Sequence, residues 1–174
     1  MSDVEKLVEI LKRANLGFYH FTDTRNLPSI RANGLLSMRE IRSARIEARC
    51  GGNAWSLDAD LRCGMDAYVH LCFFSEHPME WLARQDGRIE QSRFLKIAPE
   101  VLQLPGVMIT NGVANKADMV PQPAEAMIGQ LDLKVIYTRT DWKDPAIQER
   151  LKAARRCEVL VPGRVPAAMI GNSQ

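Results

Sequence analysis

Prolines along the second half of the chain are the feature that most limits its fold. Those at positions 99, 105, 121, 123, 162 and 166 stand between short stretches of β-branched and aromatic residues. Proline lacks the backbone N–H and interrupts both helices and central strands, which disfavours a bundle of long helices. The spacing instead predicts an α+β protein with a mixed sheet of mostly short strands.

Hydrophobic periodicity predicts the individual elements. The first is an amphipathic helix over residues 3–15, preceded by Ser2 and Glu5 in the arrangement of a capping box. Further helices are expected at 27–32, 38–48, from the turn at 75–79 to about 84, and at 145–155. Strands are expected at 18–22, 68–74, 94–97, 107–109, 135–138 and 158–161, and residues 50–66 are expected to form a long loop.

Length and charge limit the organisation of the protein. A chain of 174 residues that is 46% hydrophobic suits a single domain, which we expect over residues 1–174. Its 23 basic and 21 acidic residues give a net charge of +2, so attraction to nucleic acid would need local clustering. Four arginines spaced by three and four would form one basic stripe on a helix, and the alternative is a solvated face paired with glutamates. These residues are Arg39, Arg42, Arg45 and Arg49, with Glu40 and Glu47 as the acidic partners.

Several kinds of site and location are not indicated. No apolar run has membrane-spanning length and the N-terminus is polar, so the cytoplasm is the expected location. The cysteines at 50, 63, 72 and 157 lack a CxxC spacing, and we expect them to be reduced. No metal site is expected, the disfavoured alternative being a distributed one that uses His70 and His77. Fingerprints of Rossmann, P-loop and serine-hydrolase sites are absent.

The segment from Phe18 to Gly34 is the first candidate site. A short aromatic strand breaks into a polar turn and a capped helix, and Gly34 can supply the left-handed end of that helix. His20, Thr22 and Asn26 would place ring nitrogens, a hydroxyl and an amide along one edge, which suits a ribose or an amide head group. The alternative is a core histidine beside a polar helix cap.

Glu158 is the second candidate. Its neighbours predict a partly buried strand, where an unpaired carboxylate is costly, so the side chain is expected to be paired with an arginine or to lie in a site. The alternative is a glutamate on an edge strand that faces water.

Four motifs occur in a fixed order along the chain. They are His20 with Asn26–Ile30 and Gly34–Leu35, then Tyr68–Met79, then Ile109–Ala114, and finally Cys157–Pro162. Together they resemble the motifs of the DarT-type DNA ADP-ribosyltransferases, which are toxins of a toxin–antitoxin pair. The resemblance extends from about residue 18 to residue 170. It implies an ADP-ribosyltransferase-like fold, a split mixed β-sheet with flanking helices and a cleft that holds NAD.

The same resemblance implies roles for individual residues. Glu158 would be the catalytic glutamate, and Arg49 would be a functionally important arginine. NAD, as co-substrate, would be contacted by His20, Thr22, Asn26, Leu35, Tyr68, Phe73 and Met79. The acceptor would be a nucleobase of single-stranded DNA, held by Arg42, Arg45 and Trp55.

The implied reaction transfers ADP-ribose to that base and releases nicotinamide, and an antitoxin protein is the implied partner. Two alternatives stay open at this stage. One is an enzyme of the same fold that acts on an RNA end or a protein. The other is a catalytically silent module that binds NAD.

Overall fold

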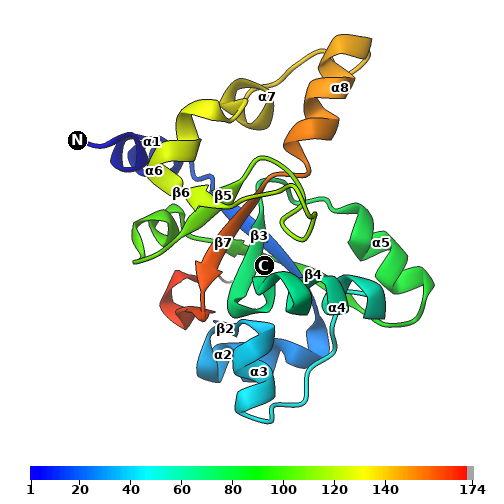
Figure 1. Cartoon of the computed structure of the whole chain (residues 1–174). Coiled ribbons are helices and arrows are strands. Elements are labelled where there is room, and N and C mark those ends of the chain that lie inside the picture. The colour runs from blue at the N-terminus through cyan, green and yellow to red at the C-terminus, as the bar shows by residue number, and fades with distance from the viewer. Residues whose placement is uncertain (172–174) are drawn as a thin grey trace.

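A six-stranded sheet forms the centre of the protein, whose computed structural model describes residues 1–171 (Figure 1). The strands run in the order β4-β1-β3-β7-β5-β6. Their bounds are β1 Phe18–Asp23, β3 Tyr68–Cys72, β4 Ser92–Ile97, β5 Met108–Thr110, β6 Gln122–Pro123 and β7 Glu158–Pro162. The α+β prediction is confirmed. Neighbouring strands pair antiparallel throughout this sheet, however, rather than in a mixed arrangement. Strand direction follows from the long-range path of the chain, which a local pattern does not record.

A second, two-stranded sheet makes the architecture split, as expected. It pairs β2 (Leu35–Leu36) with β8 (Arg164–Val165), which follows β7 after one glycine. The Ser37 amide also donates to the Gly163 carbonyl at 2.7 Å. These bonds attach helices α2 (Leu27–Asn33) and α3 (Met38–Ser43) to the end of the sheet that lies lowest in Figure 1. Strands of two residues are too short to show a period in the sequence.

Four predicted helices are present, and α2 is the one expected at 27–32. Helix α1 (Asp3–Arg13) begins with the capping box of Ser2 and Glu5 and packs its buried apolar face against the core. Helices α5 (Pro78–Gln85) and α8 (Pro145–Ala154) also agree with the sequence pattern. The chain adds α6 (Ala124–Met127) and single 3-10 turns at Thr24–Asn26, Met65–Ala67, Pro99–Gln103, Ile128–Gln130 and Ala167–Met169. Within residues 1–171, no helix combines the length and apolarity that a membrane crossing requires.

The expected loop at 50–66 is wrong, because it contains helix α4 (Ala54–Cys63). The Asn53 side chain accepts from the Ser56 amide at its start, and Gly64 ends it at a left-handed φ of +73°. None of its residues is buried, so it shows no apolar stripe in the sequence.

Two further expectations fail for local reasons. The strand expected at 135–138 is helix α7 (Leu133–Tyr137), whose first turn is capped by the Asp132 side chain. The β-branched pair Val135 and Ile136 favours a strand, but the cap decides the local structure. The helix expected at 38–48 ends at Ser43, and Arg45 adopts a left-handed φ of +54°.

Candidate active site

The main cavity lies between the sheet and the α2–α3 unit. The space between its walls, including open solvent at its mouth, is about 1110 Å³. Seven of the residues predicted to act on NAD line it: His20, Thr22, Asn26, Leu35, Arg49, Tyr68 and Glu158. They come from separate parts of the chain, and β3 lies between the strands that carry His20 and Glu158. The imidazole and the carboxylate therefore face one common space.

Glu158 lies on an inner strand, so the edge-strand alternative is wrong. It pairs with Cys72 on β3 and with Thr110 on β5, and its side chain is 17% exposed. The Ala114 amide donates to Oε2 at 2.8 Å, and Oε1 lies 3.6 Å from Nδ1 of His70. The carboxylate is thus contacted on both oxygens while it still reaches the cavity.

His20 is neutral at physiological pH. Burial lowers its pKa to about 4, and the bond to a backbone carbonyl only partly offsets this. That bond joins Nδ1 to the carbonyl oxygen of His70 at 2.9 Å, so Nδ1 carries the proton. Nε2 is then an acceptor, the form that can receive a hydrogen bond from a sugar hydroxyl.

His70 is a residue of this cavity that sequence analysis considered only as a metal ligand. On β3 the side chains alternate between buried and half-buried, and Tyr68, His70 and Cys72 share the half-buried face. That alternation is visible in the sequence and could have placed His70 beside Glu158. Within residues 1–171, no group of three or more His, Cys, Asp and Glu side chains is arranged to hold a metal ion.

Asn26 fastens the wall of the cavity that carries Arg49. Its Oδ1 accepts from the Arg49 amide at 2.9 Å, and its Nδ2 donates to the Arg49 carbonyl at 2.8 Å. Nδ2 also donates to the Thr22 hydroxyl at 3.0 Å. Asn26 stands at the N-cap position of α2, but its side chain makes no cap hydrogen bond there.

Arg49 presents a charge that no close partner neutralises in the part of the chain described. Its side chain is 53% exposed, and its ion-pair contact with Glu47 spans 3.9 Å. A guanidinium so placed can form paired hydrogen bonds with phosphate oxygens.

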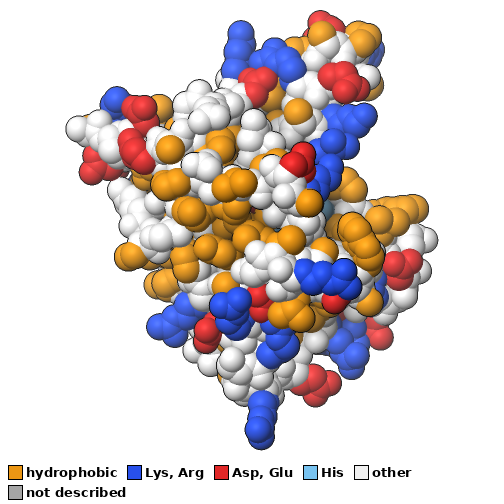
Figure 2. Space-filling model, in the orientation of Figure 1, with side chains coloured by type: hydrophobic (Ala, Val, Ile, Leu, Met, Phe, Trp, Pro, Cys, Tyr) orange, Lys and Arg blue, Asp and Glu red, His pale blue; other side chains and the backbone are white. Residues whose placement is uncertain are grey.

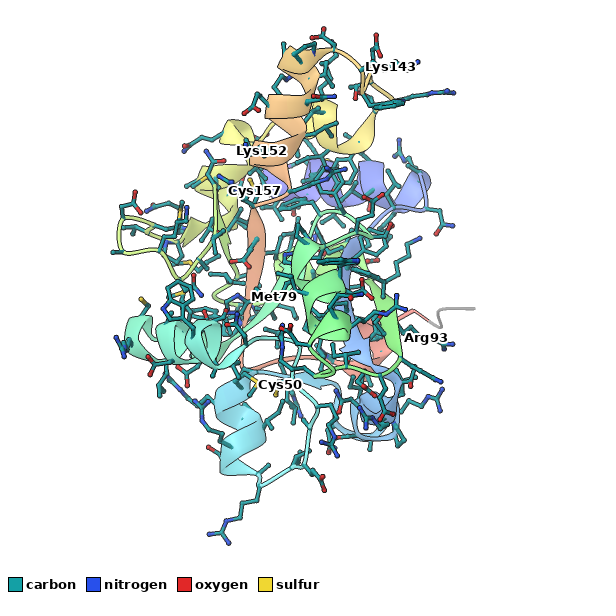
Figure 3. The ribbon with its side chains drawn as sticks, turned by 90° about the vertical axis from the view of Figure 1, so that its right-hand side faces the viewer. Cys50, Met79, Arg93, Lys143, Lys152 and Cys157 are labelled. Carbon is teal, nitrogen blue, oxygen red and sulfur yellow. The ribbon has the colours of Figure 1, made fainter. Side chains whose placement is uncertain are left out.

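Phe73 and Met79 are not among the residues that line the cavity. Phe73 is 3% exposed and packs edge-on against Phe18 at 5.4 Å between ring centroids. Side chains alternate between the two faces of β3, and Phe73, which follows this strand, continues the buried face, whereas Tyr68 lies on the opposite one. Two residues an odd number of positions apart on a strand point to opposite faces, so Tyr68 and Phe73 cannot both face NAD. Met79 lies at the start of α5 (Figure 3), where its amide donates to His77 Nδ1 at 3.1 Å. The neighbouring His77, rather than Met79, lines the cavity.

The residues predicted to bind nucleic acid do not form one stripe. Arg42 bonds to the buried Asp66, which Arg39 also contacts at 3.0 Å, so these arginines have a partner other than Glu40 or Glu47. Arg45 is exposed after the end of α3, and Trp55 is 75% exposed on α4. Figure 2 shows basic side chains around α3 and α4 with single acidic side chains between them. Their contact with DNA stays a prediction.

Comparison with known proteins finds a family match. A family model described as DarT, ssDNA thymidine ADP-ribosyltransferase, matches residues 19–172. A comparison with curated protein sequences finds no match.

Solved structures with the same fold include three with bound ligands. The first is Thermosipho africanus DarTG in complex with ADP-ribose, with a TM-score of 0.67 and 18% identity over 90% of this chain and 43% of that chain. The second is Thermus sp. 2.9 DarT in complex with ADP-ribosylated ssDNA, with a TM-score of 0.66 and 21% identity over 88% of this chain and 78% of that chain. The same Thermus protein in complex with NAD⁺ has a TM-score of 0.60 at 21% identity, again over 88% and 78%. The chain thus spans less than half of the Thermosipho chain.

Proposed function

Since the chain belongs to the DarT family of ssDNA thymidine ADP-ribosyltransferases, we propose that it transfers ADP-ribose from NAD to a thymidine base of single-stranded DNA. The observation that carries the proposal is the convergence of His20, Arg49 and Glu158 on one cavity. These residues supply an acceptor for a hydroxyl, a cation for phosphate and a carboxylate for developing positive charge. NAD contains all three of the matching groups.

The first step binds NAD. Neutral His20 accepts a hydrogen bond from a ribose hydroxyl through Nε2, and Arg49 binds the pyrophosphate. Leu35 and Tyr68 supply apolar and aromatic surface in the same cavity. The hydrogen bonds from Asn26 fix the backbone that carries Arg49. Binding therefore uses residues from both walls.

The second step breaks the bond between the ribose carbon and the nicotinamide nitrogen. Nicotinamide leaves as a neutral molecule, and positive charge develops on the sugar. A fixed carboxylate stabilises this charge, and the Ala114 amide and His70 restrict the motion of the Glu158 carboxylate.

The third step joins the sugar to the base. In thymidine, N3 is the ring nitrogen that carries a proton, and this proton must leave as the new bond to the ribose carbon forms. Glu158 is the base that accepts it. A duplex buries N3 in the Watson–Crick pair, which explains a single-stranded acceptor.

Two aspects of the wider context belong to the same proposal. We assign residues 1–174 to one domain, supported by a family match that extends over most of the chain. We also propose the cytoplasm as the location and an antitoxin protein as the partner, supported by the similarity to Thermosipho africanus DarTG.

The test is mass spectrometry of two single-stranded oligonucleotides that differ by one thymidine-to-cytidine replacement. With NAD present, the thymidine oligonucleotide should gain the mass of ADP-ribose, and the other should not. Glu158→Gln should abolish the gain. Glu149→Gln, a matched change at a 76% exposed position on α8, should keep it.

Labelled NAD incubated with separate RNA and protein pools tests the other acceptors. Label on either pool, with none on the DNA, would overturn the proposal. Binding of NAD without any nicotinamide release would overturn it as well.

A further inference from the structure

The His70 side chain lies next to the Glu158 carboxylate, and the surrounding contacts define its charge state. Nε2 lies 3.0 Å from the carbonyl oxygen of Met65, and a carbonyl only accepts, so Nε2 carries a proton. Nδ1 lies 3.6 Å from Glu158 Oε1, within ion-pair distance. A bare Nδ1 would direct its lone pair at a carboxylate oxygen, so this arrangement favours a second proton and a positively charged ring.

We propose that His70 acts as an imidazolium that positions the Glu158 carboxylate for the transfer reaction. The inference rests on the proposed function. The Ala114 amide holds Oε2, and the imidazolium holds Oε1, so the two contacts together fix the plane of the carboxylate. The ring itself is held by the Met65 carbonyl.

The same strand links this pair to the NAD-binding histidine. The backbone carbonyl of His70 accepts from His20 Nδ1 at 2.9 Å, which sets the tautomer of His20. One residue of β3 thus contacts two of the three groups that the proposed reaction uses, His20 and Glu158. Its backbone fixes the hydroxyl acceptor, and its side chain fixes the carboxylate.

The charges around His70 agree with the imidazolium form. Burial alone would lower the pKa of His70, but contact with Glu158 and the charge of Asp60 on α4 raise it to about 9. The nearby His20 ring does not oppose a positive charge on His70, because burial keeps His20 neutral. Cys72 on the same strand is a neutral thiol, since burial raises its pKa to about 12. Other charged groups nearby are Asp66 on the 3-10 turn after α4 and its two partners on α3, Arg39 and Arg42.

The loss of this contact has a defined consequence. Once the ring is neutral, Nε2 keeps its proton for the Met65 carbonyl, and Nδ1 repels Oε1. The carboxylate can then rotate about the hydrogen bond that it accepts from the Ala114 amide. A shift of about 1 Å in a catalytic group can reduce a rate by about 100-fold. NAD binding should change little, because its proposed contacts are made by His20, Arg49, Leu35 and Tyr68 rather than by the His70 side chain.

The test compares wild type with His70→Gln and His70→Lys. Glutamine is neutral, whereas lysine keeps a positive charge. We expect His70→Gln to lower kcat for nicotinamide release about 10- to 100-fold while the calorimetric Kd for NAD stays within about twofold. His70→Lys should recover part of the rate. The wild-type rate should fall as the pH passes about 9, and this alkaline limb should be absent in His70→Gln.

A measurement on the wild-type protein covers the case in which neither variant folds. The chain has 3 histidines, and burial lowers the pKa of both His20 and His77. One histidine ring should therefore remain protonated at pH 7.5 by NMR and titrate near pH 9, and Glu158→Gln should abolish that alkaline titration.

The outcomes separate the two claims. A neutral ring at pH 7.5, or a His70→Gln enzyme with the wild-type rate and pH profile, overturns the inference alone. If wild type releases no nicotinamide and modifies no oligonucleotide, the proposed function fails, and the NMR titration still decides whether His70 and Glu158 form a charged pair.

Discussion

Removal of the Asn26 side chain should loosen the cavity wall that carries Arg49. Asn26→Ala deletes two hydrogen bonds to the Arg49 backbone, at 2.9 and 2.8 Å, and one to the Thr22 hydroxyl. A hydrogen bond contributes about 1 kcal/mol net, so the two bonds to Arg49 hold this segment with about 2 kcal/mol. If Arg49 must be in place to bind NAD, that energy corresponds to about a 30-fold rise in the Kd for NAD.

Calorimetric titration with NAD provides the assay. Asn33→Ala is the matched control, because Asn33 ends helix α2, which begins directly after Asn26. The exposed Asn33 side chain bonds to Ser29 within that helix. Asn33→Ala should bind NAD as wild type does. Asn26→Asp keeps the acceptor for the Arg49 amide but loses both donor bonds, so its Kd should fall between the two. If Asn26→Ala binds NAD normally while Arg49→Ala does not, the hydrogen bonds of Asn26 are not what positions Arg49.

Three other predictions follow from the same structure. Phe73→Ala should lower the free energy of unfolding by about 3–5 kcal/mol in a denaturant titration, since Phe73 packs in the core. The Kd of the variant for NAD should stay within about twofold of wild type. If the folded variant instead loses NAD binding selectively, the predicted contact of Phe73 with NAD is restored. His70 has a folded pKa of about 9, above its ordinary value of 6.5, so its stabilising effect is complete below pH 6.5 and disappears as the pH rises through 9. The stability advantage of wild type over His70→Gln should therefore shrink by about 3 kcal/mol between pH 6 and 10, and a constant difference would contradict the charged pair. Trp55→Ala should weaken binding of single-stranded DNA by about 1–3 kcal/mol in fluorescence anisotropy with no change in melting temperature, and unaltered DNA affinity would remove Trp55 from the acceptor path.

Residues with a local signature were predictable from the sequence. The capping box at Ser2 fixes the start of α1, and Gly34 ends α2 with a φ of +79°, where an added Cβ would lie 2.4 Å from the Val165 carbonyl oxygen. The strand that carries Glu158 was also predicted, since its apolar run between a helix and a proline has a clear pattern. Local patterns of this kind operate over a few residues, and the chain retains them after folding.

The remainder depended on contacts between distant segments. The pairing of Asn26 with Arg49, and of Arg42 with Asp66, joins residues 23 and 24 positions apart, and no spacing rule links them. Helix α4 was missed because it buries no apolar face. His70 was the avoidable omission, since the alternation along β3 already puts it on the same face as Tyr68.

The proposed reaction depends most on a single carboxylate, that of Glu158, which acts in chemistry rather than in binding. The most direct measurement is the single-turnover rate of nicotinamide release by Glu158→Gln, at saturating NAD and with a thymidine-containing single-stranded oligonucleotide. We predict a rate at least about 100-fold below wild type with an NAD affinity within about twofold, as expected when a group that stabilises transition-state charge is removed. A variant that releases nicotinamide at the wild-type rate would contradict the account.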